Sequence, residues 1–527
     1  MLHARSLSLT LSFVVCTVAA CVGDNPASTP DGGGPDGGCA RTCSGVCSPD
    51  TNDPATGCGA ASCQACPTFP NQAAACAAGT CGAGACASGH LDCDPKAAGC
   101  ETVVDANNCG KCGDKCGATN TSAVSCGSAP ASDAGTSTTP ACQFTCNGSY
   151  AHCSGDDSMG CETNIANDQN NCGTCGHSCL GGLCVAGKCQ ASIVASKASN
   201  DWGNVYEIAL NGTSVYGINW YGKPPGTPSA GSVFSVPSNA TNGAATWLVK
   251  DATSGAYGGI AARFLATNGN KLVYSVYRPT DQAAGLWTVN FDGTANTNVV
   301  AGGTGNPVPC GATLAGTYVA GLAFDPTYMY WVHDRDAGSP CPGIFRADPN
   351  GANAALHLPN TYLRSPVSDG SGTIYMVSYT NDYNAGFPGI AVLATTGAAI
   401  DGAPVVVAQA GSPNVVRFDA QYVYWTDTSN SHFYRNTKVP STIEDVTPKT
   451  GMPVVGTGTF LVDTKNIYFF AGTPTQSLYV MPKDGSKPPV IVFTFPNSGD
   501  FALGTFQDDK ALYFTNYPTT AIFRLAK

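Results

Sequence analysis

The chain has 527 residues, which is too long for one domain, and only 12% of them are charged. Its 63 glycines, 35 prolines and 28 cysteines are typical of a loop-rich β protein with disulfides and disfavour a helical fold. The formal net charge of −11 argues against nucleic acid as a partner.

The N-terminus predicts export. Arg5 precedes a short apolar run, and small residues then lead to Cys21. This order is typical of a signal peptide, which we place at residues 1–20. No later apolar run is long enough to span a bilayer.

The end of this segment reads Val-Ala-Ala-Cys at 18–21 and resembles the lipobox of bacterial lipoproteins. The resemblance implies that Cys21 is lipidated and becomes the first residue of the mature chain, anchored in a membrane by its acyl chains. Position 22 is valine instead of the aspartate that retains such proteins in the inner membrane, which implies the outer membrane. The alternative is an ordinary signal peptide cut by the standard peptidase.

Residues 21–38 are rich in glycine, proline and aspartate and predict a flexible tether. Residues 39–190 then hold 24 cysteines, a density typical of a disulfide scaffold in an oxidising compartment. The segment contains a duplication in which two spaced cysteines precede Gly-Cys-Glu-Thr and then Asn-Cys-Gly-x-Cys-Gly-x-x-Cys. The first copy uses Cys86, Cys93, Cys100, Cys109, Cys112 and Cys116, and the second uses Cys146, Cys153, Cys161, Cys172, Cys175 and Cys179.

The duplicated pattern resembles cysteine-rich modules that precede propellers in exported bacterial proteins. Residues 39–66 look like a degenerate third copy, and 127–141 like a flexible insert within the second module. Metal binding is the alternative to disulfides, because the last three cysteines of each copy have ligand-like spacing. Only His177 lies near them, so we expect disulfides and no metal.

Residues 191–527 predict a mainly β fold, a seven-bladed β-propeller. A turn and an aromatic strand recur every 44 to 58 residues, most clearly at 419–427. Each unit supplies material for four antiparallel strands, and the aromatic residues are expected to pack between blades. The repeat is centred on seven tyrosines: Tyr216, Tyr274, Tyr330, Tyr375, Tyr424, Tyr468 and Tyr513.

The quartet Tyr-Trp-Thr-Asp at 424–427 resembles the YWTD propellers of lipoprotein receptors. Those receptors have six blades, whereas seven repeat units are present here. The resemblance therefore concerns the type of blade and not the number of blades. The last unit lacks a fourth strand, and 191–195 precedes the first unit without a place in it. We therefore expect 191–195 to complete the last blade and close the ring.

Loops after the tyrosine strands are expected to share one face of the propeller and to form a binding surface. Two carboxylates, Asp334 and Asp336, make Ca²⁺ conceivable there, although we predict no cofactor. Cys310 and Cys341 are the only cysteines in the propeller, and we expect them to form a disulfide. The expected binding face comprises Trp220, Tyr277, His333, Asp334, Asp336, Tyr379 and Asp427.

These features together predict an outer-membrane lipoprotein whose propeller binds an extracellular protein or glycan without catalysis. The sequence contains no Gly-x-Ser-x-Gly elbow, HExxH helix, P-loop or dinucleotide fingerprint. One alternative is a propeller enzyme of the streptogramin-lyase type, using His333 or His432. The other is a purely structural spacer of the envelope. No catalytic residue is predicted.

Overall fold

A computed structural model of the chain describes residues 41–43, 46–48, 52–59, 62–128, 140–200, 202–219, 232–249, 261–267, 269–278, 283–300, 319–325, 327–333, 343–359, 363–368, 373–378, 389–394, 405–409, 413–427, 430–438, 443–455 and 459–527. The chain divides into two compact units: residues 1–115 with 126–141, and residues 116–125 with 142–527. Within the described residues no helix is long and apolar enough to cross a bilayer.

The cysteine-rich region is a series of short two-stranded sheets, because disulfides take the place of an extended apolar core. Every described cysteine from Cys58 to Cys189 is disulfide-bonded, which confirms the expected disulfide scaffold. The paired strands are β1 (Arg41–Cys43) with β2 (Val46–Ser48), β3 (Asn52–Asp53) with β4 (Gly57–Cys58), β5 (Gln72–Ala77) with β6 (Thr80–Cys86), β7 (His90–Leu91) with β8 (Thr102–Val103), β9 (Thr121–Ser128) with β10 (Pro140–Cys146), β11 (Tyr150–Ala151) with β12 (Thr163–Asn164), and β13 (Cys184–Val185) with β14 (Lys188–Cys189).

The two modules have the same disulfide connectivity. If the eight cysteines of each are numbered in chain order, the pairs are first to third, second to fifth, fourth to seventh and sixth to eighth. The first module has Cys86–Cys100, Cys93–Cys112, Cys109–Cys126 and Cys116–Cys142. The second has Cys146–Cys161, Cys153–Cys175, Cys172–Cys184 and Cys179–Cys189.

This connectivity corrects two expectations. The insert at 127–141 belongs to the first module, because Cys126 and Cys142 on either side of it pair back to cysteines of that module. The degenerate third copy does not end at residue 66. It continues to Cys81, since Cys58–Cys76 and Cys66–Cys81 repeat the last two pairs of the complete modules. Both errors arose because the seventh and eighth cysteines lie outside the motif that repeats in sequence.

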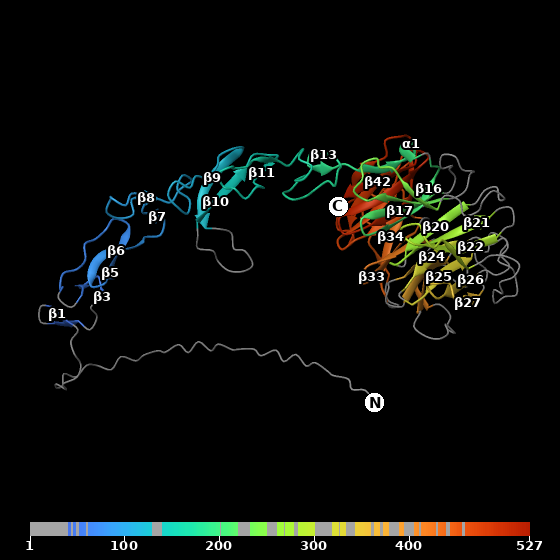
Figure 1. Cartoon of the computed structure of the whole chain (residues 1–527), viewed down its shortest axis with the longest axis horizontal. Coiled ribbons are helices and arrows are strands. Elements are labelled where there is room, and N and C mark those ends of the chain that lie inside the picture. Colours follow the sequence, from blue (N-terminus) through green and yellow to red (C-terminus); the bar gives the residue numbers. More distant parts are fainter. Residues whose placement is uncertain are drawn as a thin grey trace, which may run out of the picture. The chain divides into compact units, whose positions relative to one another are not determined.

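The second unit contains the propeller, and the expected β-propeller fold is confirmed (Figure 1). Within the described residues, six four-stranded antiparallel sheets are built from consecutive strands, and a seventh combines both ends of the propeller segment. The consecutive sheets are β16–β19 (Val205–Asn211, Ser214–Asn219, Ser232–Pro237, Thr246–Val249), β20–β23 (Ala261–Thr267, Leu272–Arg278, Ala283–Val289, Thr297–Val300), β24–β27 (Val319–Phe324, Met329–His333, Gly343–Ala347, Ala355–Pro359), β28–β31 (Leu363–Ser368, Thr373–Ser378, Gly389–Ala394, Val405–Gln409), β32–β35 (Pro413–Phe418, Tyr422–Asp427, His432–Thr437, Glu444–Asp445) and β36–β39 (Phe460–Val462, Asn466–Ala471, Ser477–Pro482, Val490–Thr494).

The seventh sheet closes the ring in the predicted way. Its strand order is β15 (Ser192–Ser196), β42 (Ala521–Ala526), β41 (Ala511–Tyr517) and β40 (Phe501–Gln507), with β15 antiparallel to β42. A short helix, α1 (Lys197–Asn200), follows β15. The first strands of neighbouring sheets contact one another in turn, and β40 contacts β16 to complete the circle.

The recurring turn and aromatic strand have a hydrogen-bonding basis. In the strongest copies an aspartate accepts two backbone N–H groups of the following turn, as Asp419 does from Gln421 and Tyr422 at 2.8 Å each. The tyrosine five positions after the aspartate donates its hydroxyl to the same carboxylate, at 2.9 Å for both Tyr424–Asp419 and Tyr468–Asp463. All seven repeat tyrosines are buried, which confirms that they are core residues.

Candidate binding site on the propeller axis

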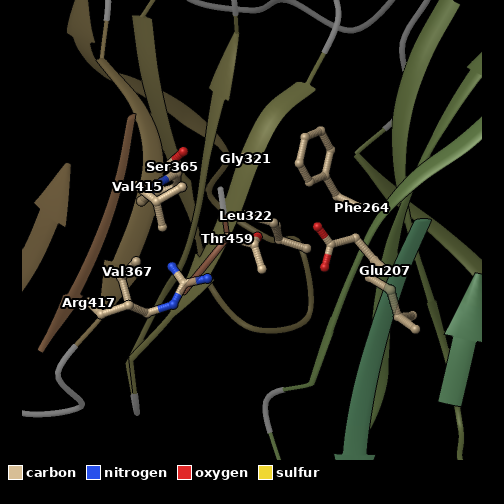
Figure 2. Close-up of a pocket in the computed structure, with 11 residues that line it drawn as sticks. Glu207, Phe264, Gly321, Leu322, Ser365, Val367, Val415, Arg417 and Thr459 are labelled. Carbon is tan, nitrogen blue, oxygen red and sulfur yellow. The ribbon is translucent and has the colours of Figure 1, made fainter. Parts of the chain in front are cut away.

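A cavity of about 280 Å³ lies among the first strands of the sheets. Because these strands form the innermost circle of the propeller, the cavity lies at its centre. Its walls come from β16, β20, β24, β28 and β32 and from Thr459, which precedes β36. The lining residues are Glu207, Phe264, Leu265, Gly321, Leu322, Ser365, Pro366, Val367, Val415, Arg417 and Thr459 (Figure 2).

β-Bulges shape this cavity. The first strand of six of the seven described sheets shifts register against the second strand, for example between Val205 and Glu207 in β16 and between Pro413 and Val416 in β32. In a regular strand, alternate side chains point into the interface between neighbouring sheets, and a bulge changes the direction of some of these side chains. It thus allows residues of an apolar strand to face the axis.

Glycine permits the close approach of neighbouring inner strands. A Cβ on Gly321 would stand 2.3 Å from Cδ of Pro366, and one on Gly504 would stand 2.7 Å from the carbonyl oxygen of Tyr206. Only glycine fits such contacts without displacing the adjacent strand. The second contact holds β40 directly against the part of β16 that carries Glu207.

Arg417 supplies the positive charge of the cavity. Its guanidinium donates one hydrogen bond to the carbonyl oxygen of Val416 at 2.8 Å and stands 5.9 Å from the centroid of the Phe460 ring. Burial lowers the pKa of Arg417, and the charge of Glu207 acts in the opposite direction. An arginine stays protonated even so. Within the described part of the chain no carboxylate lies within ion-pairing distance of this guanidinium.

Glu207 supplies the negative charge. Figure 2 shows its carboxylate and the Arg417 guanidinium on opposite walls, both directed into the cavity. Most of the other lining side chains are apolar. The cavity therefore has a basic side chain at one wall and an acidic side chain at the other, and most of the surface that it exposes is polar. Such a chamber can bind a small molecule that has separated charges of its own.

Two residues of the expected binding face lie elsewhere than predicted. His333 and Asp427, at the ends of β25 and β33, are only 1% and 4% exposed, so the expectation that they line an exposed face is wrong. His333 accepts a hydrogen bond at Nε2 from Trp331 Nε1 at 3.1 Å and packs on Phe345. Burial lowers its pKa to about 3, so it is a neutral core residue of its blade.

The other members of that face are not described in enough detail to place their side chains. Tyr277 lies in β21, where it pairs with Ala261 and Ala284. The expected disulfide between Cys310 and Cys341 and the lipidated Cys21 also fall outside the described residues. Trp220, Asp334, Asp336 and Tyr379 do so as well.

His432 lies beside a different cavity, of about 500 Å³, at the edge of the β32–β35 sheet. Its Nδ1 is 2.8 Å from Oδ2 of Asp445, and its side chain is 40% exposed. His333 does not line this cavity, so the two histidines named for a lyase share no described cavity.

Three sets of cysteine sulfurs are close enough together to suggest metal ligation: Cys58, Cys66 and Cys81, then Cys109, Cys116 and Cys142, and finally Cys172, Cys179 and Cys184. Each set belongs to two neighbouring disulfides. A disulfide sulfur is not a thiolate and is a poor metal ligand. These clusters therefore stabilise the modules and are not ion sites.

Sequence reasoning did not identify Glu207 and Arg417 as a pair. Nothing in the spacing of the repeats predicts that these two strands face each other across the axis. The available signal was local: each residue is a charge within an otherwise apolar first strand, in Val-Tyr-Glu-Ile-Ala-Leu at 205–210 and Asn-Val-Val-Arg-Phe at 414–418. A charge at such a position requires a partner or a cavity.

Comparison with known proteins identifies no family model and no curated protein that matches this chain. Solved structures do resemble it. The β-propeller domain of the trilobed protease from Pyrococcus furiosus is 9% identical, covers 62% of this chain and 95% of its own, and has a TM-score of 0.43. Oligogalacturonate lyase from Vibrio parahaemolyticus is 10% identical over 62% of this chain and 90% of its own, with a TM-score of 0.44. A chain of a nidogen/laminin complex is 17% identical over 54% and 93%, with a TM-score of 0.34. These are resemblances of fold alone.

Proposed function

We propose that this chain is an exported lipoprotein of the bacterial outer membrane. A disulfide-bonded stalk carries its propeller, which binds an extracellular ligand without catalysis. Cys21 carries the lipid, residues 21–38 form the tether and the modules form the stalk. The ligand is a protein or glycan at the cell surface, or a smaller molecule derived from one.

The disulfide scaffold supports export. Small modules with little apolar core depend on these bridges, each worth about 2–4 kcal/mol, and they form only in an oxidising compartment. The observation that carries the binding role is the axial cavity, in which the Arg417 guanidinium has no carboxylate at ion-pairing distance in the described chain. A site of this kind is suited to capturing a ligand.

The anchor is tested by replacing Cys21 with Ser. The variant should keep its signal peptide uncut by the lipoprotein peptidase, incorporate no labelled palmitate and be absent from the outer-membrane fraction. Cys16→Ser is the matched control, because it removes a cysteine five residues earlier and should leave anchoring intact. Palmitate labelling of Cys21→Ser, or its recovery in the outer-membrane fraction, would show that the lipobox interpretation is wrong.

The exposed His432–Asp445 pair favours a second candidate, an enzyme that acts on an extracellular small molecule. A carboxylate that orients a histidine beside an open cavity is a known arrangement for a general base. The binding proposal expects no turnover when the protein is incubated with cyclic ester peptides and the mixture is analysed by mass spectrometry. Ring opening by the wild type that disappears in His432→Ala would favour the enzyme.

A further inference from the structure

We propose that the contact between the last cysteine-rich module and the propeller depends on pH through the protonation of His177. This module–propeller contact joins residues 172–189 to the end of β42 and to Lys527. The proposal goes beyond the proposed function, because it requires neither a ligand nor the lipid anchor. It rests on the hydrogen-bonding geometry of one imidazole ring.

Both ring nitrogens of His177 face backbone oxygens. Nδ1 lies 2.6 Å from the oxygen of Cys172 in the same module, and Nε2 lies 2.8 Å from the oxygen of Lys527. A neutral imidazole has one N–H donor and one lone pair, so it can donate to only one of these acceptors. The other nitrogen then directs its lone pair at an oxygen, which is repulsive. The protonated ring donates to both oxygens, so the geometry fits the imidazolium form.

The first module shows that this position does not require a histidine. The N–H of Cys172 donates to the carbonyl oxygen of His177 at 2.8 Å, and in the first module Cys109 donates in the same way to Asp114 at 2.8 Å. Asp114 thus occupies the position that corresponds to His177. Asp114 is exposed, whereas His177 is half-buried. The fold of the loop accepts either residue, and the histidine belongs to the module that contacts the propeller.

The other described interactions of the module–propeller contact do not titrate near neutral pH. Ala526 of β42 packs against the buried disulfide cysteines of the module, and these carry no proton. The guanidinium of Arg524 donates to the carbonyl oxygen of Leu180, and an arginine stays protonated. Histidine changes its charge between about pH 5 and 8. His177 is therefore the group that can make this contact depend on pH.

The charged side chains at the end of β42 are cations, which disfavour a further positive charge on His177. Both are directed to other partners: Lys527 Nζ donates to the carbonyl oxygen of Asp508 at 2.6 Å, and Arg524 donates to two backbone oxygens. On the module side, Lys188 is exposed. The carboxylates whose charges act on Lys527 are those of Asp463, Asp508 and Asp509. The cation at Lys527 is thus offset by acidic neighbours.

The direction of the pH effect follows from the number of donors on the ring. Loss of the proton removes one of the two hydrogen bonds of His177, and histidine side chains lose this proton around pH 6.5. The module–propeller contact is therefore stronger on the acid side of that range and weaker on the alkaline side. The Arg524 and Ala526 contacts persist on both sides, so the contact loosens without being abolished.

Hydrogen–deuterium exchange of the full-length protein, followed in peptides that cover 180–190 and 521–527, tests the proposal. His177→Gln keeps one donor and cannot titrate. Its exchange rates are divided by those of the wild type at the same pH, which cancels the intrinsic pH dependence of exchange. At pH 5.5 the variant should exchange about tenfold faster, because it lacks a charge-assisted hydrogen bond. At pH 8.5 the two proteins should exchange at about the same rate.

His432→Gln is the matched control, because it removes an exposed histidine from another sheet and should leave both peptides unchanged at either pH. If His177→Gln does not fold, His177→Asp takes its place. The first module carries aspartate at this position, and the carboxylate would repel the oxygen of Lys527. This variant should lose at least as much protection at pH 5.5.

NMR of the wild type labelled with ¹⁵N-histidine gives a second readout. The signal that disappears in the His177 variant should show a doubly protonated ring at pH 5.5 and lose that form over the pH range in which the two peptides lose protection. The proposal is overturned if His177 is neutral at pH 5.5. It is equally overturned if the ratio of variant to wild-type exchange is the same at pH 5.5 and pH 8.5.

Discussion

At the scale of single residues, the glutamate of the repeated Gly-Cys-Glu-Thr motif organises each module. Glu162 Oε1 accepts the backbone N–H groups of Cys153 and Ser154 at 2.9 and 2.7 Å, and Glu101 accepts those of Cys93 and Asp94 at 3.0 and 2.8 Å. The motif repeats because this carboxylate fixes the turn around the second cysteine of the module. Burial raises the pKa of Glu162, but backbone hydrogen bonds outweigh it and lower the pKa to about 2.

This pKa predicts a pH dependence. The folded-state pKa of Glu162 is below its ordinary value of 4.5, so its stabilisation is complete above that pH and is lost as the pH falls through about 2. Glu162→Gln should lower the local stability of the second module by about 1–2 kcal/mol at pH 7. Hydrogen exchange at the amides of Cys153 and Ser154 measures this difference, which should shrink as the pH approaches 2.

Glu444→Gln is the control, because Glu444 is a half-exposed carboxylate of the propeller and its loss should leave exchange in the module unchanged. Equal protection of the Cys153 and Ser154 amides in wild type and Glu162→Gln at pH 7 would contradict this role for the glutamate.

The tyrosine of the repeat gives a second residue-scale prediction. Tyr468 is buried and donates its hydroxyl to Asp463 at 2.9 Å. Tyr468→Phe leaves that aspartate short of one donor and should reduce the free energy of unfolding by about 1 kcal/mol. Tyr479→Phe is the comparison, because no described residue bonds its hydroxyl and its ring stacks on Phe469. Denaturant melts that show the same loss for both variants would rule out a specific contribution of the Tyr–Asp bond.

At the scale of elements, β15 decides whether the ring is closed. Val194 is fully buried where β15 packs in the seventh sheet, while its neighbour Ile193 is 39% exposed. Val194→Ala should lower the free energy of unfolding by about 2 kcal/mol and promote aggregation, because a loosened β15 uncovers the edge of β42. Ile193→Ala should have a much smaller effect. Thermal melting and light scattering of the two variants test the closure, and identical behaviour of the pair would contradict it.

Elements that repeat could be predicted from the sequence, and elements that depend on a partner far along the chain could not. The aromatic strands and the closure by 191–195 follow from periodicity and from counting strands per unit, and the structure confirms both. The disulfide connectivity depends on the distances between cysteines in the folded chain, and the spacing of the cysteines along the sequence does not give these distances. The cavity depends on the β-bulges of the inner strands, which turn Glu207 and Arg417 toward the propeller axis. These bulges do not appear as a periodic pattern in the sequence, so the cavity could not be predicted.

At the scale of the whole molecule, the second module and the propeller belong to one compact unit. His177 Nε2 lies 2.8 Å from the carbonyl oxygen of Lys527, and Arg524 of β42 donates to the carbonyl oxygens of Leu180 and Ser238. The strand β42, with which β15 pairs to close the ring, thus also contacts the last cysteine-rich module.

The central claim is that an exported, lipid-anchored and disulfide-bonded stalk carries the propeller. Mass spectrometry of the protein purified from cell membranes and digested without reduction tests it most directly. The account predicts an acylated N-terminal peptide that begins at Cys21, the same four cysteine pairings in each module and a further pair between Cys310 and Cys341. Free, alkylatable thiols within residues 86–189, or a chain that still begins at Met1, would contradict it.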